Sequence, residues 1–174
     1  ALTNQCTLRA AIQSANNRSD ADNIEFTLMS ITLENDLPVI LYPVTIGPDS
    51  PPRVDLNGAG SNSGLVLDEL AAGSVIRNLV IRNMSGNGIS LTTGAGGNAI
   101  QGCYIGTNPA GSAAAANGGD GISISSPSGP LPPAGLTLID DNVISGNEGD
   151  GIDIFGPNTT LVTIIRNFIG TDRN

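Results

Sequence analysis

Four six-residue segments of the chain share one pattern of apolar and polar residues, and this repeat constrains the fold more than any other feature of the sequence. Each segment begins and ends with isoleucine. The segments are Ile76–Ile81, Ile100–Ile105, Ile139–Ile144 and Ile164–Ile169. Three of them are followed by a second unit that begins with Gly-Ile, namely Gly88–Leu91, Gly121–Ile124 and Gly151–Ile154. Self-similarity of this kind is typical of repeat proteins, in which each unit packs against the next.

The strands predicted within each unit are too short to bury an apolar face alone. Each can pair in parallel with its equivalent one repeat away, at a spacing of about 4.8 Å. The repeat is 24 residues from Ile76 to Ile100 and 25 from Ile139 to Ile164. It lengthens to 39 between Ile100 and Ile139, where a segment rich in Ala, Gly and Asn around residues 107–117 is predicted to be an inserted loop. The pattern therefore predicts an all-β fold, a parallel β-helix with stacked isoleucines inside.

Two other folds do not fit this pattern. A leucine-rich repeat carries a Leu-x-x-Leu-x-Leu string, and a βαβ protein carries amphipathic helices of about ten residues between its strands. The sequence has neither feature. We therefore expect one domain over residues 1–174, with irregular first coils in 23–70 and regular repeats in 74–174. Ile24–Leu28 is expected to form one strand of the first coils.

One helix is predicted, within an N-terminal cap region of residues 6–22. It runs from Thr7, a residue type that caps helix N-termini, to Ala15. Its apolar stripe consists of Leu8, Ala11, Ile12 and Ala15. A helix before the first coil would cover apolar interior and strand edges that would otherwise face water.

The other end of the stack is expected to be uncapped. A repeat has just begun at residues 171–174, and no capping segment follows. An uncapped end exposes strand edges and apolar core. We expect the chain to be a fragment of a longer solenoid. The alternative is a subunit that self-associates head to tail through its C-terminal coil.

Charge and composition exclude several functional classes. The net charge is −9, and the seven cationic residues are all arginines, since the sequence has no Lys and no His. Such a chain lacks the basic face that nucleic acids require. Without His it has no Ser-His-Asp triad and no His-ligated zinc. No apolar run reaches the length of about 18 residues that spans a membrane, so we expect no membrane insertion.

Two sets of motifs resemble one known family. Residues Cys6–Ile12, followed by Asn23–Phe26, resemble the Cys-Ser-Leu-Arg-Glu-Ala box of secreted bacterial proteins, with a departure at Ala10, where Glu is usual. The repeats of the same proteins are similar to Cys103–Asn108, Val143–Asn147 and Phe168–Asp172. The resemblance covers nearly the whole chain. It implies a right-handed, pectate-lyase-like β-helix that is exported and often attached to the cell surface. Because most members lack a demonstrated activity, it supplies no catalytic residues.

The candidate catalytic residues are Asp140, Asp141, Asp153 and Arg166, because polysaccharide-degrading enzymes on this fold combine clustered aspartates with a cation. Asp141 and Arg166 occupy equivalent bends one coil apart, within reach of an ion pair. Glycosidases need two carboxyl groups roughly 5 to 9 Å apart beside a groove, which adjacency in the sequence does not supply. We therefore assign no catalytic residue and keep these four for the enzymatic alternative.

A calcium site is a second candidate. Asn87, Asp120 and Asp150 each precede the glycine of a Gly-Ile unit and are expected to stack. Carboxylates about 4.8 Å apart repel each other, and calcium with oxygen ligands would relieve this repulsion. Asn-Gly and Asp-Gly also form turns without a metal. We expect no cofactor, with Asp120 and Asp150 as the ligands if calcium binds.

Two columns of side chains run along the second strand of each repeat. The outward column is Val80, Tyr104, Val143 and Phe168. If exposed, it forms an apolar stripe that binds sugar rings or another protein, and if loops fold over it, it becomes core. The inward column is Leu79, Cys103, Asn142 and Asn167, which predicts a buried thiol and an amide ladder.

These features together predict a non-enzymatic structural or adhesive module, exported by a bacterium and part of a larger cell-surface protein or assembly. Its expected partner is a polysaccharide or a cell-surface protein. The alternative is a carbohydrate-active enzyme, either a polysaccharide lyase or a glycoside hydrolase, on the same scaffold.

Overall fold

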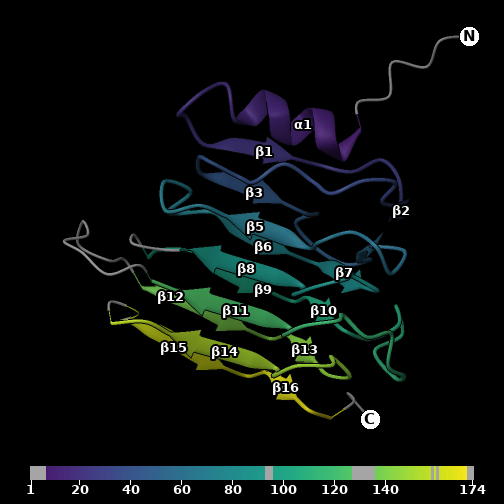
Figure 1. Ribbon diagram of the computed structural model, residues 1–174. Helices are drawn as coiled ribbons and strands as arrows, with labels where there is room; N and C mark the ends of the chain where they lie inside the picture. Colours follow the sequence, from purple (N-terminus) through teal and green to yellow (C-terminus); the bar gives the residue numbers. More distant parts are fainter. Residues whose placement is uncertain (1–6, 93–95, 127–135, 158, 160, 172–174) are drawn as a thin grey trace, which may run out of the picture.

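Three parallel β-sheets and one short helix make up the protein in a computed structural model that describes residues 7–92, 96–126, 136–157, 159 and 161–171 (Figure 1). Sheet A contains β1 (Asp22–Ile24), β3 (Val44–Ile46), β6 (Val75–Arg77), β9 (Ala99–Gln101), β12 (Thr137–Asp140) and β15 (Val162–Ile165). Sheet B contains β2 (Ser30–Thr32), β4 (Val54–Asn57), β7 (Leu79–Arg82), β10 (Tyr104–Ile105), β13 (Val143–Ile144) and β16 (Phe168–Ile169). Sheet C contains β5 (Leu65–Leu67), β8 (Ile89–Thr92), β11 (Ile122–Ser125) and β14 (Ile152–Phe155). The all-β prediction is confirmed.

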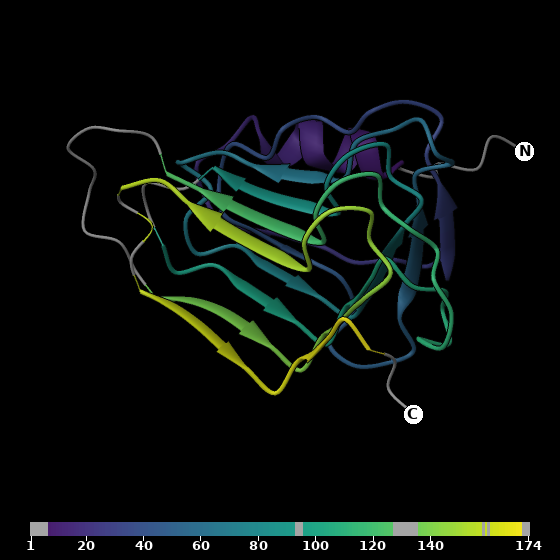
Figure 2. The same cartoon turned by 60° about the horizontal axis from the view of Figure 1, so that its bottom comes forward.

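The strand register agrees with the alignment of the repeats. From β6 onward the chain enters sheets A, B and C in the same order, so that neighbours in each sheet come from consecutive repeats. Ile100 pairs with Ile76 on one side and Ile139 on the other, and Ile139 pairs with Ile164. Figure 2 shows the three sheets on three sides of a common interior.

Isoleucines from successive repeats fill that interior. Ile76, Ile100 and Ile139 in sheet A are at most 1% exposed. They belong to one hydrophobic cluster that includes buried side chains from all three sheets. Burial of one such side chain contributes about 1.5–3 kcal/mol, so the stacked columns supply most of the driving force for folding.

The corners between sheets explain the polar residues of the repeat. Asn78, Gly102, Asp141 and Arg166 each occupy the third position of a six-residue segment and turn the chain from sheet A to sheet B with φ between 49° and 62°. At the corner before sheet C, a Cβ on Gly88 would lie 2.8 Å from the carbonyl oxygen of Gly121 in the next repeat. The Gly-Ile unit therefore begins with glycine because the layers approach too closely for a side chain.

Helix α1 (Leu8–Ala15) lies beside β1 at one end of the stack, as expected for a cap (Figure 1). The Oγ1 of Thr7 accepts a hydrogen bond from the N–H of Ala10, which confirms Thr7 as the N-cap. Leu8, Ile12 and Ala15 are buried. Residue 6, the first of the expected cap region, lies outside the described residues.

The first coils differ from the prediction at Ile24–Leu28. β1 ends at Ile24, and residues 25–29 lie outside the strands. Ile24 pairs with Ile46 in sheet A, whereas Ser30 pairs with Asp55 in sheet B. The chain therefore uses this segment to pass from one sheet to the next.

The predicted amide ladder is present at the corner between sheets A and B, immediately before β13 and β16. The Oδ1 of Asn142 accepts a hydrogen bond from the N–H of Cys103 at 2.8 Å, and its Nδ2 donates to the carbonyl oxygen of Ile100 at 2.9 Å. The Oδ1 of Asn167 accepts from both the N–H and the Nδ2 of Asn142. The ladder gives buried backbone groups a hydrogen-bond partner between layers.

Candidate functional site

The outward column of sheet B stacks in the predicted register. Val80 pairs with Tyr104, Tyr104 with Val143, and Val143 with Phe168. The column does not form an exposed stripe, because Val80, Tyr104 and Val143 are at most 6% exposed and make a second hydrophobic cluster. Phe168 is exposed. The prediction of a contact stripe is therefore wrong at three of its four positions.

A loop and an arginine cover Tyr104 in this column. Gly111 of the 107–117 loop lies so close to Tyr104 that a Cβ at this position would be 2.8 Å from the ring. The guanidinium of Arg53 lies 3.8 Å from the centroid of the same ring, and its Nε donates a hydrogen bond to the carbonyl oxygen of Gly102 at 2.6 Å. The insertion in the sequence is the feature that indicates a covering loop. No feature of the sequence indicated the cation–π contact between Arg53 and Tyr104.

The four candidate catalytic residues do not converge. Asp140 is the last residue of β12 in sheet A, and Asp141 and Arg166 are bend residues beside it. Asp153 lies on β14 of sheet C, on another side of the molecule (Figure 2). The four candidate residues therefore do not provide two carboxylates that face each other across a groove.

The ion pair at the bend involves Asp140 instead of Asp141. The Nε of Arg166 donates to the Oδ1 of Asp140 at 2.9 Å, and an Nη atom donates to its Oδ2. Asp140 is buried while Asp141 is exposed. Hydrogen bonding to Asp140 raises the pKa of Arg166 above its ordinary value. The pair joins one repeat to the next.

A second ion pair between repeats was not predicted. The Nε and Nη2 of Arg82 donate to the two carboxylate oxygens of Asp55 at 2.8 and 2.9 Å, and Ser30 donates to the same carboxylate at 3.3 Å. The hydrogen bond from Arg82 to Asp55 raises the pKa of Arg82. The alternation of Val54–Leu56 places Asp55 outward, but the irregular first coils gave no alignment that pairs it with Arg82.

Asn87, Asp120 and Asp150 stack as expected. The Oδ1 of Asn87 accepts a hydrogen bond from the N–H of Asp120, and the Oδ1 of Asp120 accepts one from the N–H of Asp150, both at 2.8 Å. Asp120 thus does what the neutral Asn87 does one layer earlier. Among the described residues, no three Asp, Glu, Cys or His side chains are placed to hold a metal ion.

Cys103 is a buried, free thiol, as predicted. Burial raises its pKa to about 11. Its Sγ lies 3.4 Å from the carbonyl oxygen of Gln101, within the range of a weak hydrogen bond. A thiol that is neutral and inaccessible is a poor nucleophile and a poor metal ligand, so Cys103 is part of the core.

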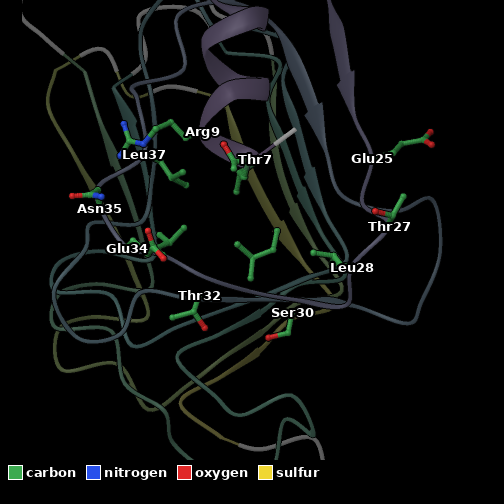
Figure 3. Close-up of a pocket in the computed structure, with 13 residues that line it drawn as sticks. Thr7, Arg9, Glu25, Thr27, Leu28, Ser30, Thr32, Glu34, Asn35 and Leu37 are labelled. Carbon is green, nitrogen blue, oxygen red and sulfur yellow. The ribbon is translucent and has the colours of Figure 1, made fainter. Parts of the chain in front are cut away.

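A hollow of about 770 Å³ lies at the helix end of the stack, between α1 and residues 25–37 (Figure 3). Its lining mixes apolar side chains, such as Leu8 and Leu33, with polar ones, such as Thr27 and Glu34. The outermost strand of sheet B, β2, forms one wall. No pattern in the sequence indicated this hollow, because its walls come from the irregular first coils.

Sheet C has an outer face of small polar side chains. Ser90, Ser123 and Asp153 form one column across β8, β11 and β14. Thr92, Ser125 and Phe155 form the next column. Phe155 is 52% exposed, so this face combines an accessible aromatic ring with hydroxyl and carboxylate groups.

Comparisons with protein-family models, curated proteins and solved structures found no match to this chain. Within the part of the chain that the structure describes, no helix has the length and apolar character needed to cross a membrane. Only the chemistry and placement of the side chains therefore bear on the function.

Proposed function

We propose that the chain is a right-handed parallel β-helix and acts as a non-enzymatic structural or adhesive module outside a bacterial cell. The repeated order of sheets A, B and C supports a coil, and parallel crossovers are right-handed in about 98% of cases. One domain then extends over residues 1–174. Its cap is in 6–22, its irregular coils are in 23–70 and its regular repeats are in 74–174.

The observation that carries this proposal is that three carboxylates, two of them candidate site residues, join layers together. Asp140 binds Arg166, Asp55 binds Arg82, and Asp120 accepts the N–H of Asp150. Hydrolysis of a glycosidic bond canonically uses two carboxyl groups that are free to act on a substrate between them. In this chain the best-placed carboxylates are instead part of the scaffold.

The resemblance of residues 6–12 to the Cys-Ser-Leu-Arg-Glu-Ala box supports export to the cell surface as part of a larger protein. The acidic surface supports solubility outside the cell. The proposed partners are a polysaccharide or a cell-surface protein, since flat, stacked sheets offer long contact surfaces.

Self-association is proposed at the layer formed by β14, β15 and β16. Ile154, Ile164 and Ile169 are 38–45% exposed there, whereas their equivalents one layer earlier, Ile124, Ile139 and Ile144, are at most 1% exposed. Exposed apolar side chains on parallel strands with one unpaired edge favour contact, either with a further coil of a longer solenoid or with another chain. A head-to-tail contact would set this layer against the end covered by α1. Light scattering over a range of concentrations tests the contact, and a strictly monomeric protein refutes it.

The test of the main proposal is an assay against acidic and neutral polysaccharides, with and without a chelator. We expect binding without product formation. Release of shorter products from any of them refutes the non-enzymatic function. In that case, loss of turnover in Asp140→Asn and Asp153→Asn would favour a lyase or a glycoside hydrolase.

A further inference from the structure

The side of the molecule formed by sheet C carries carboxylates and, among the described residues, no arginine. Asp120 and Asp150 lie immediately before the Gly-Ile units that lead into β11 and β14, and Asp153 lies on β14. The described arginines are Arg9, Arg18, Arg53, Arg77, Arg82 and Arg166. All of them lie on α1, on sheets A and B, or on the segments between these elements. Carboxylates lie on all parts of the molecule, but those beside sheet C have no described arginine on the same sheet.

Crowding of these carboxylates favours a cationic partner. Asp120 and Asp150 are neighbours in the stack, and Asp153 is on the strand that follows Asp150. Adjacent layers are about 4.8 Å apart, and two like charges at this distance repel each other measurably even at a solvent-exposed protein surface. An anionic polysaccharide would add to this repulsion, whereas an ammonium group would reduce it.

An exposed aromatic ring stands on the same face. Phe155 and Asp153 are two residues apart on β14, so that both side chains point away from the interior. Ser125 pairs with Phe155, and Ser123 pairs with Asp153. The ring is half exposed, and the partly exposed Ser125 lies beside it on the neighbouring strand, whereas Ser123 is buried. This arrangement offers a flat apolar surface with one hydroxyl group and one carboxylate beside it.

A pyranose sugar matches that arrangement. One side of the sugar ring is a surface of C–H groups, which pack against the negative face of an aromatic ring. Its hydroxyl and ammonium groups donate to carboxylates, and such charge-assisted hydrogen bonds are the stronger ones. A peptide with several cations would satisfy the charge but would not need the aromatic ring.

We propose that the outer face of sheet C binds a glycan of amino sugars that carry free ammonium groups. One sugar ring packs on Phe155, and neighbouring ammonium and hydroxyl groups bind Asp153 and Asp150. This inference rests on the proposed function, since it names the ligand class of the same adhesive module. It replaces the buried column of sheet B as the sugar-binding surface.

The test is calorimetric titration of the full chain with a glucosamine hexamer. Affinity is expected to fall as NaCl is raised, because the partners attract each other through exposed charges. The N-acetylated hexamer, which lacks ammonium groups, is expected to bind about tenfold more weakly, and an oligogalacturonate is not expected to bind. Equal affinity for the acetylated and deacetylated hexamers overturns the proposal.

Variants locate the surface. Phe155→Ala and Asp153→Asn are each expected to weaken binding of the glucosamine hexamer about three- to tenfold. Phe155→Leu, which keeps an apolar side chain without the ring, should weaken it as Phe155→Ala does. Asp141→Asn removes an exposed carboxylate from the bend between sheets A and B and should leave binding unchanged. Since Phe155 and Asp141 are exposed, thermal unfolding should not change in these variants.

Three outcomes contradict the proposal: unchanged binding in Phe155→Ala, equal weakening by Asp141→Asn and Asp153→Asn, or equal competition by a lysine oligomer. No binding at all refutes the inference and leaves the module proposal intact if another polysaccharide binds. Cleavage of a hexamer that binds through Phe155 does the opposite, because it supports the surface and refutes the non-enzymatic function.

Discussion

Replacement of Asn142 by leucine is expected to destabilise the protein strongly. Asn142 is fully buried, and its side chain bonds the N–H of Cys103 at 2.8 Å and the carbonyl oxygen of Ile100 at 2.9 Å. Leucine would leave both buried backbone groups without a partner, at a cost of about 1–3 kcal/mol each. Added apolar burial offsets part of this cost. We expect a net loss of about 2–4 kcal/mol, out of a total stability of about 5–15 kcal/mol.

Urea unfolding measures this change as a lower midpoint with an unchanged m value. Leucine fits the column sterically, because Leu79 is buried at the equivalent position of an earlier repeat. Asn167→Leu is the matched control: Asn167 is only partly buried, so water can replace its bonds and the loss should be about 1 kcal/mol or less. If Asn142→Leu unfolds at the same urea concentration as the wild type, the ladder does not stabilise the stack.

Three further predictions concern side chains that join or fill the layers. Arg82→Leu should lower stability by about 1–3 kcal/mol in urea unfolding, because it leaves the carboxylate of Asp55, 12% exposed, without its cation; full stability in this variant would show that the pair is dispensable. The thiol of Cys103 has its pKa raised by burial from 9.0 to about 11, so the unfolded chain loses this proton first and stability falls between pH 9 and pH 11. Comparison of unfolding curves with Cys103→Ala, which should lack this part of the pH dependence, checks the effect. Asp120→Asn should keep its stability because the amide oxygen still accepts the N–H of Asp150, whereas Asp120→Ala should lose about 1 kcal/mol. A calcium-dependent rise in melting temperature that disappears in Asp120→Asn would instead support a metal site.

The stack was predictable because its signal is local and repeated. The equivalence of Ile76, Ile100, Ile139 and Ile164 can be read from spacing alone, and the pairing of these strands follows from it. The same alignment predicted the amide ladder at Asn142 and Asn167. Repetition makes long-range contacts visible, since each residue predicts the position of its equivalent one layer away.

Features that depend on a single layer were not predictable. Exposure of the Tyr104 column depends on the path of one loop, which has no equivalent in other repeats. Arg166 pairs with Asp140 and not with Asp141. This pairing depends on the directions of the two carboxylates at a bend where Asp141 and Arg166 have positive φ. The bond between Asp55 and Arg82 involves a coil that does not align with the rest. In each case geometry within one layer, and not periodicity, determines the contact.

The inserted loop has a consequence for how this scaffold can vary. Residues 107–117 lengthen one repeat, yet β10 and β11 on either side still pair residue for residue with β7 and β8. Thr107 and Ala114 close the base of the loop through an antiparallel bridge. Chain length at this corner is thus independent of the spacing between layers. A foreign segment grafted between these two residues would leave the stacked isoleucines of the interior unchanged, provided that it still covers Tyr104 as Gly111 does.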